Sequence, residues 1–127
     1  MRVTIPRTAV AGTIAVAACL LAASAGAASF NCAKAQTTDE KAICHNPALS
    51  DLDTQMATLF AVRMKVPMLM GARGDAGDEQ SQWLQSRHAC GASVACLTGS
   101  YKGRISVLNA EIDAAMQDYC VKLGICG

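Results

Sequence analysis

Cysteine and histidine are the residues of this chain with the widest range of chemistry. Seven cysteines and two histidines are present, and His45 follows Cys44 directly while His88 lies two residues before Cys90. Thiolates and imidazoles at close, regular spacing bind zinc, but the spacings here are irregular. We therefore expect no metal site and no cofactor, and cysteines that are bridged.

Six cysteines follow residue 28, and an even number in a small exported chain is typical of a disulfide framework. Many pairings are open to six cysteines, and the sequence alone does not choose among them. Pairs that close short loops across helix ends bring the β-carbons close enough for a bond. On that ground we expect Cys32–Cys44, Cys90–Cys96 and Cys120–Cys126.

Catalytic motifs are absent from the sequence. We find no GxSxG, no HExxH, no phosphate-binding loop and no dinucleotide fingerprint, so we do not expect an enzyme. Met64, Met68 and Met70 form a loose cluster, and thioethers bind Cu(I). Methionine more often fills irregular apolar gaps. A periplasmic metal-binding protein is therefore only a minor alternative.

The N-terminal segment has the pattern of a signal peptide. Arg2 and Arg7 precede an uncharged apolar stretch over residues 9–28, and Ala25-Gly26-Ala27 fits a small-x-small cleavage rule. The mature chain is expected to begin at Ala28 or Ser29. We take residues 1–28 as the signal peptide and 29–127 as one exported domain, periplasmic or extracellular, with no membrane span after cleavage.

An alternative starts from Val16-Ala17-Ala18-Cys19, which is similar to a lipobox and would make the protein a lipoprotein anchored at Cys19. The apolar run continues through Leu20 and Leu21, whereas a polar tether usually follows a lipidated cysteine. Cleavage near residue 28 is therefore favoured.

Charge excludes one class of partner. Without Arg2 and Arg7, nine basic residues stand against ten acidic ones, so the mature net charge is −1. Nucleic-acid binding requires a basic stripe, and none is present. The oligomeric state is not determined by the sequence.

Helical patterns run through the mature region, and no strand alternation appears. Thr37 and Glu40 fit a capping box that begins a short helix ending near Cys44. A second helix should begin at Asn46 or Ser50 and stop at Pro67. Ser93 is expected to cap the last and longest helix, and Gly124 to end it. An apolar stripe marks that helix: Val94, Leu97, Tyr101, Ile105, Leu108, Ile112, Ala115 and Tyr119. The fold class is all-α, a small disulfide-stapled hairpin or bundle of about four helices.

Residues 71–77 contain three glycines, which predicts a mobile loop, with Asp78 capping the third helix. A glycine-rich loop can enter a cleft that a helix cannot. We place the candidate partner contact on residues 71–79, with Arg73, Asp75, Asp78 and Glu79 as its polar groups. The alternative is a solvated connector.

Several motifs follow one another in a fixed order over about residues 29–110. They are SFNCAKA (29–35), EKAIC (40–44), NPALSDLD (46–53), QWL (82–84) with Arg87 and Cys90, and Cys96-Leu97, Tyr101, Arg104-Ile105 and Leu108. Together they resemble the lysozyme-inhibitor LprI-type N-terminal domain family of bacterial exported proteins, and the chain departs from that family where Phe60 replaces a Tyr and His88 an Asp.

This resemblance implies a binding module that inhibits lysozyme by occluding its cleft, with lysozyme as the protein partner. The alternative is a structural or protein-interaction module of the bacterial envelope without lysozyme activity. The motif side chains themselves have structural interpretations. Glu40 caps the first helix, Trp83 anchors the core, Tyr101 lies on the apolar stripe, and Asp53 pairs with Arg87 to join the second and third helices.

Overall fold

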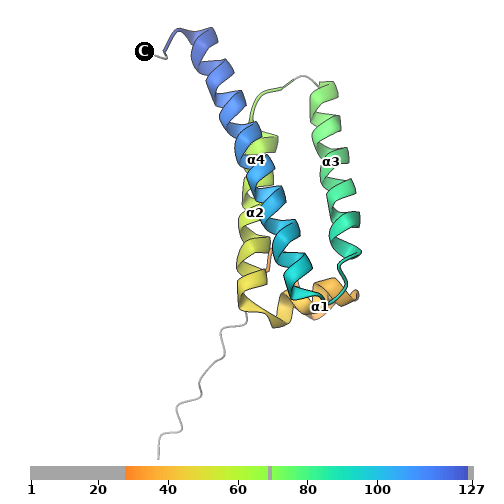
Figure 1. The fold of residues 1–127 in the computed structure, drawn as a ribbon. Helices are drawn as coiled ribbons and strands as arrows, with labels where there is room; N and C mark the ends of the chain where they lie inside the picture. The colour runs from red at the N-terminus through yellow and green to blue at the C-terminus, as the bar shows by residue number, and fades with distance from the viewer. Residues whose placement is uncertain (1–27, 69, 126–127) are drawn as a thin grey trace, which may run out of the picture.

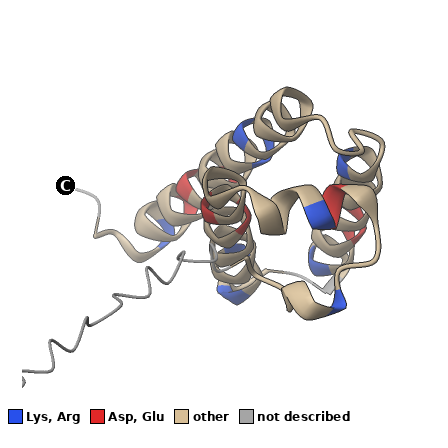
Figure 2. Cartoon of the chain, turned by 90° about the horizontal axis from the view of Figure 1, so that it is seen from below, with Lys and Arg blue, Asp and Glu red and all other residues tan. Residues whose placement is uncertain are grey.

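Four α-helices make up the described part of the chain, residues 28–68 and 70–125 of a computed structural model, and no strand occurs there. The all-α prediction is confirmed, and the C-terminal helix is the longest. Helices α2 and α4 lie side by side, α3 runs along them, and α1 crosses their lower end (Figures 1 and 2). The elements are a 3-10 turn Cys32–Lys34, α1 Thr38–His45, α2 Pro47–Lys65, α3 Met70–His88 and α4 Val94–Leu123.

Helix starts follow the predicted caps. The Thr37 hydroxyl accepts from the Glu40 N–H at 3.4 Å, and the Glu40 carboxylate accepts from the Thr37 N–H at 3.1 Å, which completes the capping box. The backbone N–H of Gln36, followed by that of Thr37, donates to the Glu40 carboxylate and lowers its pKa. Asn46 caps α2 ahead of Pro47, and Ser93 caps α4.

The predicted loop over residues 71–77 is wrong, because this segment forms the first two turns of α3. Asp78 lies within that helix and does not cap it. Each glycine disfavours a helix by about 1 kcal/mol relative to alanine, but tertiary contacts oppose that cost. Ala76 is only 4% exposed, and the Arg73 guanidinium donates to the Met64 carbonyl at 2.9 Å.

The core lies mainly between α2 and α4. The predicted stripe on α4 is buried from Leu97 to Leu108, whereas Val94 is exposed and the positions from Ile112 onward are half-buried. This change occurs because α4 continues past the end of α2 (Figure 1). The fully or nearly buried apolar cluster is Ile43, Leu49, Met56, Leu97, Tyr101, Ile105 and Leu108.

Two of the three expected disulfides are present. Cys32–Cys44 ties the 3-10 turn to the last turn of α1, with Cα atoms 5.7 Å apart. Cys90–Cys96 closes the turn between α3 and α4 at 5.5 Å, where Gly91 has a φ of +53° that favours glycine. Cys120 is also disulfide-bonded, but its expected partner Cys126 lies outside the described residues.

Gly124 ends α4 in the left-handed conformation, as expected, with a φ of +66°. Its N–H donates to Val121, and the Ile125 N–H donates to Cys120, the paired bonds of a Schellman motif. Residues 1–27 of the predicted signal peptide (1–28), which include the lipobox at Cys19, lie outside the described residues. Among the described helices, none is sufficiently long and apolar to span a membrane.

Candidate functional site

A buried polar cluster joins all four helices beneath the apolar core. Its centre is Arg87 on α3, whose guanidinium contacts Asp39 Oδ2 through Nε at 3.1 Å and through Nη2 at 2.9 Å. Asp53 on α2 is farther away, 3.7 Å from Arg87 Nη1. The expected Asp53–Arg87 pair is therefore present only as the weaker contact, and Asp39 is the principal partner.

Asp39 had not been singled out from the sequence. It occupies the N2 position of α1, where an acidic residue is common because it stabilises the helix dipole. Its register in the helix places the side chain inward, against the last turn of α3, where His88 Nδ1 also lies 2.9 Å from Oδ1. Only the packing of α1 across the bundle end reveals this role.

Tyr101 on α4 completes the cluster. Its hydroxyl donates to Asp53 Oδ1 at 2.8 Å and accepts from Arg87 Nη1 at 3.2 Å. The other oxygen of Asp53 accepts from the backbone N–H of Ser29 at 2.6 Å. Every buried side-chain nitrogen and oxygen in the described residues has a partner. Such a satisfied network stabilises the fold.

Titration properties agree with a structural role for the cluster. Burial raises the pKa of Asp39, but hydrogen bonds from Thr37 and His88 and the charge of Arg87 outweigh that effect and lower it to about 2. Burial, followed by the adjacent Asp53 carboxylate, raises the pKa of Tyr101 well above its usual value. Asp39 is therefore held as a carboxylate and Tyr101 as a neutral phenol over a wide pH range.

Trp83 lies at the edge of this region. Its indole is half-buried, packs edge-on against Tyr101 with ring centroids 5.4 Å apart, and donates to the Ser100 carbonyl at 3.4 Å. The Arg87 guanidinium lies 5.8 Å from the ring centroid. Trp83 therefore covers the polar cluster and contacts the core without being enclosed by it.

The predicted partner residues lie along α3 and do not form a protruding tip. Arg73, Asp75, Asp78 and Glu79 are all exposed, but Arg73 is bound to the Met64 carbonyl. Glu79 lies 4.0 Å from Arg104, beside a groove of about 620 Å³ between α3 and α4 that Trp83 also lines. A helical segment cannot thread a narrow cleft as the predicted loop would have done.

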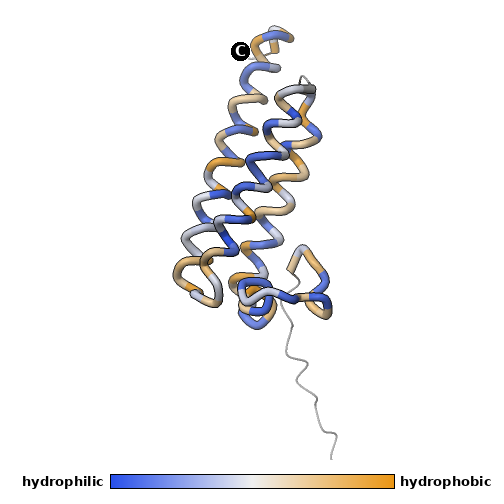
Figure 3. The backbone as a smooth tube through the Cα atoms, turned by 90° about the vertical axis from the view of Figure 1, so that its right-hand side faces the viewer, coloured by the Kyte–Doolittle hydropathy of each residue, from blue (hydrophilic) through white to orange (hydrophobic). Residues whose placement is uncertain are grey.

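An apolar groove occurs instead where α4 extends beyond α2. Its volume is about 760 Å³. Met116, Leu123 and Ile125 are 59%, 66% and 71% exposed, so large apolar side chains face solvent there. Hydrophobic segments are visible near the far end of α4 in Figure 3. We call this surface the α4-end groove; it is lined by Val62, Lys65, Val66 and Pro67 and by Asp113, Met116, Gln117, Tyr119, Cys120, Leu123 and Ile125.

The base of the α4-end groove is fixed to the bundle. Tyr119 donates its hydroxyl to the Pro67 carbonyl at 3.0 Å, and the buried Val66 ends α2 at the same level. Lys65 and Asp113 supply one charge of each sign along the lining. The groove is therefore a preformed surface on the helical framework.

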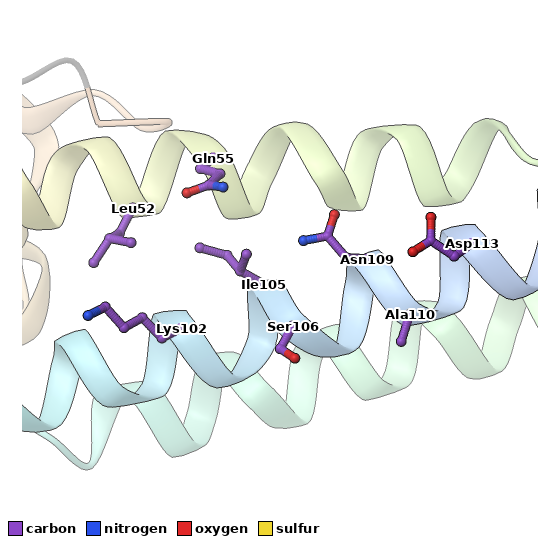
Figure 4. Close-up of a pocket in the computed structure, with 8 residues that line it drawn as sticks. All are labelled: Leu52, Gln55, Lys102, Ile105, Ser106, Asn109, Ala110 and Asp113. Carbon is purple, nitrogen blue, oxygen red and sulfur yellow. The ribbon is translucent and has the colours of Figure 1, made fainter.

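A second, more polar groove continues along the same pair of helices. Its volume is about 600 Å³. Figure 4 shows Leu52 and Gln55 of α2 on one side and residues of α4, among them Ile105 and Asn109, on the other. Asp113 borders both grooves. The side chains of this second groove form no acid–base pair or cation cluster.

Of the three methionines in the predicted cluster, the structure gives a contact for the sulfur of Met68. Met68 Sδ accepts from Arg63 Nη1 at 3.3 Å, and a bound guanidinium disfavours a cation at that sulfur. His45 and His88 lie at separate places, the first bonded to the Lys41 carbonyl and the second to Asp39. Within the described residues, no group of three His, Cys, Asp or Glu side chains converges as a metal site.

No protein-family model, curated protein or solved structure matches the chain. Its functional assignment therefore rests on its own residues and their arrangement.

Proposed function

We propose that this chain is an exported, non-enzymatic binding module that inhibits lysozyme, and that the projecting end of α4 is the element that contacts lysozyme. The observation that carries the choice of surface is the exposure of Met116, Leu123 and Ile125 around the α4-end groove. The choice of partner rests on the resemblance of residues 29–110 to lysozyme inhibitors.

Exposed apolar patches of this kind support protein binding on physical grounds. Soluble proteins rarely leave large contiguous apolar surface in water, and such surface commonly marks an interaction site. Methionine and aromatic side chains are enriched at the centres of protein interfaces. Met116 and Tyr119 line the α4-end groove, whose lining also includes the charged residues Lys65 and Asp113.

The inhibition mechanism would be steric. Glycosidases such as lysozyme act through two carboxyl groups that flank the scissile bond in an open cleft. The end of α4 projects beyond the rest of the bundle (Figure 1), and a helix with its side chains is about 10–12 Å wide. A projecting helix end seated over such a cleft would exclude the polysaccharide without any reaction.

The residues that carry the resemblance have structural roles in the fold and do not form the proposed lysozyme contact. Asp53, Arg87 and Tyr101 are buried in the polar cluster, and Glu40 completes a helix cap. The α4-end groove lies mostly beyond residue 110, outside the resemblance. The contact surface would therefore be specific to this chain, and so would its choice among lysozymes.

Lysozyme turnover on bacterial cell walls, measured with the purified exported protein, tests the proposal. We expect dose-dependent inhibition that falls at least tenfold in the double variant Met116→Asp/Leu123→Asp, because two charges then occupy the apolar contact. Val107→Asp is the matched control: Val107 is 47% exposed on the same helix but lies outside the α4-end groove. Inhibition by that control should equal the wild type, and circular dichroism should be unchanged in both variants.

Two results would contradict parts of this proposal. No inhibition by the wild-type protein would remove lysozyme as the partner and favour the envelope-interaction module. Inhibition that survives Met116→Asp/Leu123→Asp but is lost in Asp78→Lys/Glu79→Lys would move the contact to the exposed face of α3.

A further inference from the structure

The buried polar cluster has an unequal charge inventory. Two carboxylates, Asp39 and Asp53, share one buried guanidinium, that of Arg87. Arg87 makes its two shortest carboxylate contacts with Asp39 and lies 3.7 Å from Asp53. Asp53 is only 1% exposed, so its carboxylate is shielded from water. Its one nearby cation, the Arg87 guanidinium, lies farther from it than from Asp39.

The close partners of Asp53 are neutral hydrogen-bond donors. One is the Tyr101 hydroxyl at 2.8 Å, and the other is the backbone nitrogen of Ser29 at 2.6 Å. The nitrogen of Ser29 is the shorter contact and comes from the first segment of the domain, 24 residues before Asp53. Ser29 itself lies at the surface, so its nitrogen joins the outside of the molecule to a buried carboxylate.

We propose that signal-peptide cleavage occurs between Ala28 and Ser29, and that the new α-ammonium group of Ser29 forms an ion pair with Asp53. The nitrogen that now donates as an amide would donate as a cation, without a change in its position. The cluster would then contain two cations and two carboxylates. Gly26 and Ala28 would be the small residues at the third and first positions before the cut, as cleavage requires.

The chemistry of the step is ordinary hydrolysis of one peptide bond by the export peptidase. Water adds to the Ala28 carbonyl, the C–N bond to Ser29 breaks, and the released amine takes up a proton. This inference rests on the predicted export of the chain and does not depend on lysozyme inhibition. In the precursor the same nitrogen is an uncharged amide, so the ion pair would exist only after processing.

Intact-mass measurement of the protein exported from the full-length precursor is the first test. The expected mass is that of residues 29–127 with disulfides formed. A mature chain that begins at Ala28 or elsewhere would overturn the proposal.

The second test compares two mature chains, one that begins at Ser29 and one that begins at Ala28, each released from a fusion that leaves no extra residue. The second chain keeps the Ser29 N–H as an amide donor and keeps the Ala28 side chain, which packs against the core. The two chains therefore differ in two respects: the nitrogen that contacts Asp53 is charged only in the Ser29 chain, and the Ala28 side chain is present only in the Ala28 chain.

In the Ser29 chain, an NMR titration should place the α-amino pKa at least one unit above its usual range of about 7.7–8.0. A group whose pKa is raised on folding stabilises the folded state below its unfolded pKa, and this stabilisation is lost as the pH rises through the raised pKa. The denaturant midpoint of the Ser29 chain, relative to that of the Ala28 chain, should therefore be higher at pH 6 than above the raised pKa, whereas the contact of Ala28 with the core does not depend on pH. A midpoint difference that is the same at both pH values, or an α-amino pKa in the usual range, would overturn the ion pair.

The groups that surround this nitrogen define the remaining control. Asp53→Asn should return the α-amino pKa to its usual range, whereas Glu40→Gln, which alters a nearby carboxylate of a helix cap, should leave it raised. If Asp53→Asn does not fold, the comparison of the Ser29 and Ala28 chains decides the question. The charged or titratable side chains of the cluster are Asp39 and Glu40 of α1, Asp53 of α2, Arg87 and His88 of α3 and Tyr101 of α4.

Discussion

The hydroxyl of Tyr101 donates to Asp53 Oδ1 at 2.8 Å and joins α4 to α2 across 48 residues of sequence. The same hydroxyl accepts from Arg87, so one phenol connects a carboxylate to a guanidinium. Tyr101 is fully buried, and no water replaces its bonds without repacking. The core of this small domain is therefore organised by a polar network as well as by apolar contacts.

Tyr101→Phe should destabilise the domain by about 1–3 kcal/mol, because it removes the buried hydroxyl that donates to Asp53 Oδ1. Tyr119→Phe is the matched control. Its hydroxyl bonds to the Pro67 carbonyl near the surface, where water can replace it, so the change in unfolding free energy should be much smaller. Urea denaturation of both variants measures the difference. A loss at Tyr119 as large as that at Tyr101 would contradict the central role of the network.

Arg87→Met should destabilise by about 3–5 kcal/mol, since it leaves two buried carboxylates without their guanidinium. Arg63→Met removes a comparable arginine whose ion pair with Glu111 is only partly buried, and should cost about 0–1 kcal/mol. The free energy of unfolding in denaturant tests both values. Similar effects at the two arginines would show that burial does not decide their importance.

We expect the folded domain to lose stability in acid as the Asp39 carboxylate becomes protonated. Its pKa falls from 3.8 to about 2 on folding, so its contribution is fully present above pH 3.8 and is lost as the pH falls through about 2. The shift corresponds to at most about 2.5 kcal/mol. Thermal denaturation from pH 5 to pH 2 should show this decrease, and Asp39→Asn should show a shallower one. Parallel pH profiles for the two proteins would contradict the assignment.

Gly74→Ala should stabilise the domain by roughly 0.5–1 kcal/mol, because Gly74 is helical and an added β-carbon meets no atom within 4 Å. Gly124→Ala should destabilise the domain, since Gly124 has a φ of +66° and alanine is strained in that conformation. Thermal melting of both variants tests whether residues 71–77 are helical. Destabilisation by Gly74→Ala would favour the mobile loop expected from the sequence.

The all-α fold, the caps at Thr37 and Ser93, the glycine at the end of α4, and the local disulfides Cys32–Cys44 and Cys90–Cys96 were all accessible from the sequence. Each depends on residues within about a dozen positions of one another. Capping, helical periodicity and short loop closure act over that range, so their signals remain visible in a single chain.

Tertiary packing decided the rest. Local propensity favoured a loop over residues 71–77, but a helix forms there, with Ala76 buried and Arg73 bound to the end of α2. Arg87 was expected to pair with Asp53, and the position of α1 across the bundle made Asp39 its closer partner. The apolar stripe of α4 is buried from Leu97 to Leu108 and only half-buried from Ile112 onward, because α2 is shorter than α4. Burial and ion pairing depend on which helix lies opposite, and that is set only when the chain has folded.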